Sequence, residues 1–157
     1  MTDTRGVSKD DWDVLVAVPF AVFFLVAYAD GRLAPAERRA FASIVGDIGA
    51  RAVRPEDGLV REVMGQISGD PGQIMNRLDG QMGAGLPFYE VLSAGRSVLD
   101  GLAEADESLA FRHAMIDLAE RVAHAWPILG RRTSVEEQRS IDFVRDRLGL
   151  PGDAGSR

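Results

Sequence analysis

Two acidic residues, Asp30 and Glu37, stand on either side of a turn predicted between two helical segments. An almost entirely apolar run over residues 14–29 comes before the turn. Gly31 suits a helix C-terminus because it adopts positive φ at little cost, and Pro35 suits the first position of the next helix. Carboxylates and free backbone carbonyls are the hard oxygen ligands that calcium prefers. The pattern therefore predicts a candidate divalent-cation site at this turn.

Ordinary helix chemistry explains one of these acids better than the other. Glu37 falls in the first turn of the second helix, where a carboxylate complements the positive end of the dipole. Asp30 lies near a helix C-terminus, where free carbonyls disfavour a negative charge, and a bound cation would offset that cost. Without a cation, Asp30 would pair with Arg32 or Arg38, or cap the turn through its own side chain. Two carboxylates do not supply the roughly six to eight oxygens that calcium needs, and the segment lacks an EF-hand pattern, so both interpretations stay open.

Residues 29–37 read Ala-Asp-Gly-Arg-Leu-Ala-Pro-Ala-Glu and follow the apolar run directly. This pattern resembles the TerB-like family of tellurite-resistance proteins. The resemblance implies an all-helical fold with two helix-turn-helix units, in which Asp30 and Glu37 are metal-site acids. It also implies a cytoplasmic, non-enzymatic protein of stress-response systems that binds a divalent cation, calcium in preference to zinc.

A second, partial copy of this unit covers residues 116–150. It has an apolar helix over residues 116–125 and, after a turn, a second helix over residues 134–148. The second helix is expected to end at Gly149, as the second helix of the first copy is expected to end at Gly49. The sequence therefore predicts two related helix-turn-helix units.

The second copy contains only one of the two predicted metal-site acids. Glu137 matches Glu37 and would form a half-site, but the turn at residues 126–130 reads Trp-Pro-Ile-Leu-Gly and has no acid to match Asp30. An ion-free protein–protein interaction module that uses the apolar loop around Trp126 is therefore the alternative function. The same loop would also serve as a structural plug folded into the core, which is the interpretation that we favour for Trp126 itself.

Length and composition restrict the class of protein. A chain of 157 residues with 46% hydrophobic content fits one domain over residues 1–157, with residues 1–7 and 151–157 expected to be flexible. The absence of cysteine excludes disulfides and thiolate metal sites. A net charge of -6 and a pI near 4.9 argue against a general nucleic-acid binder, because phosphate contacts need clustered Lys and Arg.

The apolar run over residues 14–29 raises the question of a membrane span. It is shorter than the roughly 20 apolar residues that a span needs, it contains Pro19, and acids such as Asp13 and Asp30 flank it. The acid-rich segment before the run also argues against a signal peptide. We therefore expect a buried central helix, with peripheral membrane contact as the alternative.

A single-domain, all-α bundle of about seven helices is expected, because no alternating strand pattern or hairpin dipeptide appears. Ser8 is predicted to cap the first helix, and residues 104–107 are expected to form an acidic hinge. The predicted helices cover residues 8–29 with a kink or break at Pro19, then 35–48, 55–67, 70–82, 86–103, 108–126 and 134–148.

Four ionisable residues, His113, Asp117, Glu120 and His124, would line one face of a single helix. This spacing suits a zinc site, but it also suits the solvated face of an amphipathic helix, which we favour. The opposing apolar stripe consists of Phe111, Met115, Leu118, Val122 and Ala125. No nucleophile elbow or glycine-rich phosphate loop appears, so an enzyme is not expected.

Overall fold

Six α-helices and one 3-10 helix make up the part of the chain that the computed structural model describes, which is residues 7–27, 35–69, 88–102, 104–125 and 134–150. No strand occurs within these ranges, so the described part of the chain is all-α, as predicted. The elements are α1 (Lys9–Ala27), α2 (Pro35–Arg51), η1 (Pro55–Asp57), α3 (Gly58–Gly69), α5 (Phe88–Asp100), α6 (Ala105–Ala125) and α7 (Ser134–Arg147).

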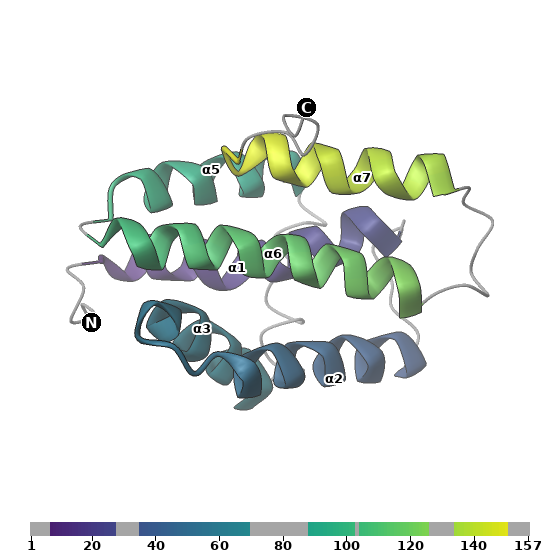
Figure 1. Cartoon of the computed structure of the whole chain (residues 1–157), viewed down its shortest axis with the longest axis horizontal. Coiled ribbons are helices and arrows are strands. Elements are labelled where there is room, and N and C mark those ends of the chain that lie inside the picture. Colours follow the sequence, from purple (N-terminus) through teal and green to yellow (C-terminus); the bar gives the residue numbers. More distant parts are fainter. Residues whose placement is uncertain (1–6, 28–34, 70–87, 103, 126–133, 151–157) are drawn as a thin grey trace.

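The helices form three layers, and α1 lies in the middle one beside α6 (Figure 1). The α5 and α7 helices cover one side of this middle layer, while α2 and α3 cover the other. Helix α1 contacts α3, α5, α6 and α7, so it is surrounded by later parts of the chain.

The sequence of α1 explains its central position. Residues 15–18 and 20–24 are all buried, so the helix has no solvated face over most of its length. Its start is capped as predicted, because the backbone N–H of Asp11 donates to Ser8 Oγ at 3.1 Å. The helix also continues through Pro19 from Lys9 to Ala27, so the proline does not divide it.

Helix α2 extends past the end that the sequence suggested. A C-terminus at Ile48-Gly49 was expected, but the helix continues to Arg51, so this prediction is wrong. A Cβ atom at position 49 would lie 3.1 Å from the Cβ atom of Met64. Gly49 therefore lets α2 and α3 approach closely, and it does not terminate the helix.

The expected acidic hinge at residues 104–107 is also wrong, because α6 begins at Ala105. Asp106 lies in the first turn of α6, where its carboxylate favours helix formation. Ser108 does not open the helix; its hydroxyl is buried and donates to the backbone carbonyl of Leu99 at 3.0 Å. This bond joins the end of α5 to the start of α6.

The end of α7 has the form predicted for a glycine cap. Gly149 has φ 81°, the N–H of Gly149 donates to the Asp146 carbonyl at 3.1 Å, and the N–H of Leu150 donates to the Arg145 carbonyl at 3.0 Å. This pair of bonds is a Schellman motif. Within the described ranges, no helix combines the length and the apolar character needed to cross a membrane.

Candidate functional site

The turn predicted to bind a cation lies between α1 and α2, and Asp30 is outside the residues that the structure describes. Glu37 lies in the first turn of α2, and Glu137 lies in the first turn of α7. The apolar loop around Trp126 is also outside the described residues. Among the residues that are described, no group of three or more His, Cys, Asp or Glu is arranged to hold a metal ion.

An aromatic cluster joins α1 to α2 close to this turn. The ring of Phe41 in α2 lies 4.9 Å, centroid to centroid, from the rings of both Phe20 and Phe23 in α1. All three side chains are fully buried. Phe23 is one helical turn before the end of α1, and Phe41 is one helical turn after Glu37. The cluster therefore fixes the end of α1 against the start of α2.

The ionisable face predicted on residues 113–124 is solvated. His113, Glu120 and His124 are exposed and Asp117 is partly exposed, whereas the apolar stripe on the other face is buried wherever its side chains are described. The four residues form no group able to hold a metal ion. His124 Nδ1 instead lies 2.7 Å from the backbone carbonyl of Glu120. The interpretation as the solvated face of α6 is confirmed.

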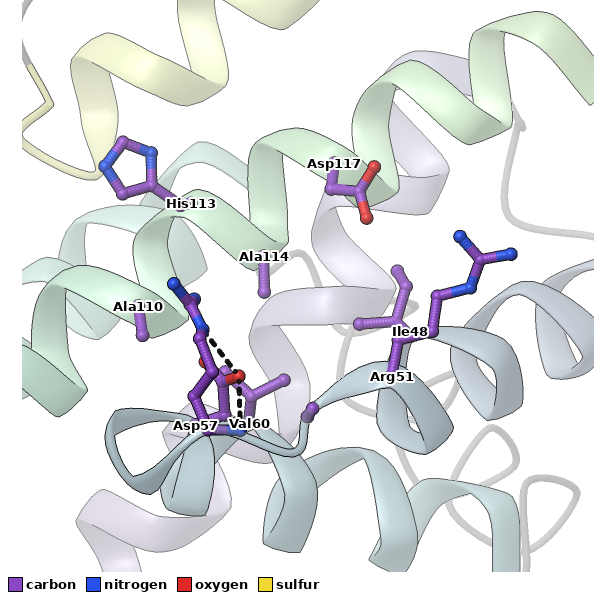
Figure 2. Close-up of a pocket in the computed structure, with 10 residues that line it drawn as sticks. Ile48, Arg51, Asp57, Val60, Ala110, His113, Ala114 and Asp117 are labelled. Atoms are coloured by element: carbon purple, nitrogen blue, oxygen red, sulfur yellow. Dashed lines mark hydrogen bonds and ion pairs between the residues drawn. The ribbon is translucent and has the colours of Figure 1, made fainter.

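A pocket of about 210 Å³ lies between the C-terminal end of α2, η1 and α6 (Figure 2). Small and apolar side chains from three elements form part of its lining, while arginines, acids and His113 supply the polar part. The residues that line it are Ile48, Arg51, Ala52, Arg54, Asp57, Val60, Ala110, His113, Ala114 and Asp117.

Arg54 and Asp57 form a closed ion pair at one side of this pocket, which Figure 2 marks with dashed lines. The guanidinium donates from Nε to Oδ2 and from Nη2 to Oδ1, both at 3.1 Å, and the backbone N–H of Arg54 donates to Oδ2 at 3.2 Å. Asp57 is buried. The hydrogen bonds from Arg54 lower the pKa of the Asp57 carboxyl, so this buried group stays ionised.

A second set of ion pairs links α2 to α6 beside the pocket. Arg121 of α6 donates to Asp47 of α2, and its Nε lies 3.2 Å from both carboxylate oxygens of Asp117. Arg51 Nε also lies 3.2 Å from Asp47 Oδ2. The hydrogen bond from Arg121 is the main cause of the lowered pKa of Asp47. These groups hold the two helices together through alternating charges.

The ion pairs of the pocket-lining residues are local along the chain, and the pair that joins α2 to α6 is Asp47–Arg121 beside the pocket. Each arginine and each acid that lines it is bonded to a group of opposite charge. Sequence reasoning missed this arrangement, because Asp47 and Arg121 are 74 positions apart and no local pattern links them. The Arg54–Asp57 pair, in contrast, spans only three positions beside Pro55, so a local signal for it existed.

Comparison with known proteins assigns no family to this chain, because no protein-family model, no curated protein and no solved structure matches it.

Proposed function

We propose that the chain is a non-enzymatic, TerB-like binding module of a cytoplasmic tellurite-resistance or stress-response system. It binds a divalent cation at the turn between α1 and α2. Asp30 and Glu37 supply carboxylate ligands there, together with backbone carbonyls of the turn. Glu137 forms a half-site in the second unit. Calcium is preferred to zinc, because carboxylate and carbonyl oxygens are hard ligands and the sequence has no cysteine.

The observation that supports this proposal is the aromatic cluster of Phe20, Phe23 and Phe41. It ties α1 to α2, and Phe41 follows the proposed ligand Glu37 by four positions, which is about one helical turn. A cation site at a turn needs ligands from both flanking helices to be held near one another, because each ligand that must be ordered on binding weakens affinity. The cluster supports the proposal because it joins the two helices that flank the turn.

Calorimetric titration of the metal-stripped protein with calcium, and separately with zinc, tests the proposal. We expect saturable calcium binding that is lost or weakened about tenfold or more in Asp30→Asn, since one carboxylate ligand is removed. Glu37→Gln should weaken binding in the same direction. Zinc should bind more weakly than calcium.

The matched control is Glu104→Gln, which removes one charge from an exposed residue just before α6 and should leave calcium binding unchanged. An absence of calcium binding, or equal binding by the wild type and Asp30→Asn, would contradict the proposed site. The ion-free interaction module would then be the leading account of the chain.

A further inference from the structure

A second pocket, which we call the α1–α5 groove, lies between the N-terminal halves of α1 and α5 and has a volume of about 380 Å³. Val14 and Ala17 of α1 and Val91 and Ala94 of α5 form its apolar lining. Ala17 and Val91 are each only 6% exposed, so they form the floor. This volume lies within the range of pockets that hold small ligands.

Carboxylates stand on both sides of this apolar lining. Asp10 and Asp13 come from α1, and Glu90 comes from α5. Lys9 Nζ lies 3.0 Å from Asp13 Oδ2 and neutralises that acid. Among the described residues, no Lys, Arg or His forms an ion pair with Asp10 or Glu90 at the groove.

The arrangement of these acids selects the kind of cation. Among the described residues, the three carboxylates do not form a group that could hold a metal ion. They flank an apolar surface from two different helices. A ligand that matches this surface carries separate positive charges joined by an apolar chain, because each ammonium then reaches a carboxylate while the methylene groups cover the apolar lining.

We propose that the α1–α5 groove binds a linear aliphatic diamine or polyamine. One ammonium group donates to Asp10 and another to Glu90, and the methylene chain lies on Val14, Ala17, Val91 and Ala94. This site uses none of the residues of the turn between α1 and α2, so its test is independent of the calcium proposal.

Calorimetric titration with spermidine at low ionic strength tests the inference. We expect saturable binding of one spermidine per chain, weakened about tenfold or more in the double variant Asp10→Asn/Glu90→Gln, because two charge-assisted hydrogen bonds are lost. Butylamine, which has one ammonium group, should bind more weakly than 1,4-diaminobutane. Saturating calcium should not compete with spermidine.

The double variant Glu104→Gln/Asp106→Asn is the matched control, since it removes the same charge from exposed residues at the start of α6. It should bind spermidine as the wild type does. The variant Ala94→Leu keeps every carboxylate but fills the groove, so it should also weaken binding; it carries the test if circular dichroism shows that the charge variant is unfolded.

Three results would overturn the inference. They are the absence of saturable spermidine binding, an equal loss of affinity in the two double variants, and unchanged binding in a folded Ala94→Leu variant. The second result would show that the affinity for spermidine depends on the net charge of the protein and not on the groove.

Discussion

The Asp57 carboxylate is buried and receives three hydrogen bonds from Arg54, so its ionised form is stabilised in the folded protein. Its pKa in the folded protein is lowered below the ordinary value by these bonds. A lowered folded-state pKa means that the carboxylate stabilises the fold fully at pH values above its unfolded pKa of about 3.9. That stabilisation is lost as the pH falls through the lower folded-state pKa.

Asp57→Asn should therefore reduce the free energy of unfolding at neutral pH by about 1–3 kcal/mol, because charge-assisted hydrogen bonds to a buried group are removed. The difference between wild type and variant should shrink below about pH 4. Urea unfolding at several pH values measures both effects.

Glu56→Gln is the control for this measurement. Glu56 Oε2 also lies 3.4 Å from Arg54 Nη1, but the Glu56 side chain is 37% exposed and this ion pair is longer than the Arg54–Asp57 pair. We expect a loss of less than about 1 kcal/mol. Equal losses in the two variants, or a constant difference across the acid range, would contradict the assignment of the stabilising charge to Asp57.

Local sequence chemistry was sufficient to find some of the residues that matter and not others. The Ser8 cap and the Gly149 cap were predicted because both depend on neighbours within a few positions. The pairing of Asp47 with Arg121 depends on how α2 lies against α6. No periodicity in either helix contains that information, so this pair and the pocket beside it were missed.

Gly95 sets the distance between α1 and α5. A Cβ atom at this position would lie 2.5 Å from Cγ2 of Val18, which is fully buried in the core. Valine has a stiff side chain on a helix and the surrounding core is close-packed, so Val18 cannot move aside cheaply. The absence of a side chain at residue 95 is therefore a packing requirement.

Gly95→Ala should lower the free energy of unfolding by about 1–3 kcal/mol through overpacking, even though alanine favours helix. Gly65→Ala in α3 is the matched control, because an added Cβ there meets no atom within 4 Å. It should stabilise the protein by up to about 1 kcal/mol. Thermal unfolding followed by circular dichroism gives both values, and stabilisation by Gly95→Ala would show that the close approach is wrong.

Helix boundaries were predicted correctly where the signal lies in the terminal turn itself. Pro35 and Ser134 begin helices as expected, since their signals lie in the first turn itself. The expected end at Gly49 and the expected hinge at residues 104–107 were wrong, because Gly49 serves the close approach of α2 to α3 and Ser108 bonds to the Leu99 carbonyl instead of opening α6. A glycine or a serine can mark a helix boundary or make a tertiary contact, and the sequence alone does not distinguish these two roles.

The whole molecule is organised around α1, which was correctly predicted to be a buried helix because its apolar residues occupy every face. The number of helices in the complete chain stays a prediction. The arrangement of the layers could not be predicted, because several amphipathic helices present similar apolar faces and the sequence alone does not say which face meets which.

Native-state hydrogen exchange should find the slowest amides in the C-terminal half of α1, over residues 20–24. These amides become accessible only when the helices on both sides separate, so their exchange should report global unfolding. Amides near the start of α7, where Gln138 and Arg139 are exposed, should exchange through smaller openings. Equal protection in α1 and at the start of α7 would contradict the central role of α1.

The central position of α1 also has a consequence for protein synthesis. Helix α1 ends at Ala27 and α5 begins at Phe88, so 88 − 27 = 61 positions separate the core helix from its first large covering partner. At a translation rate of about 5–20 residues per second, the ribosome needs about 3–12 s to reach the first residue of α5, and α6 and α7 come later still. During that interval α1 can be covered only by α2 and α3, so the nascent chain exposes the apolar faces that α5, α6 and α7 later bury, and holding chaperones bind surface of this kind. The protein therefore completes its fold only after α7 has been made.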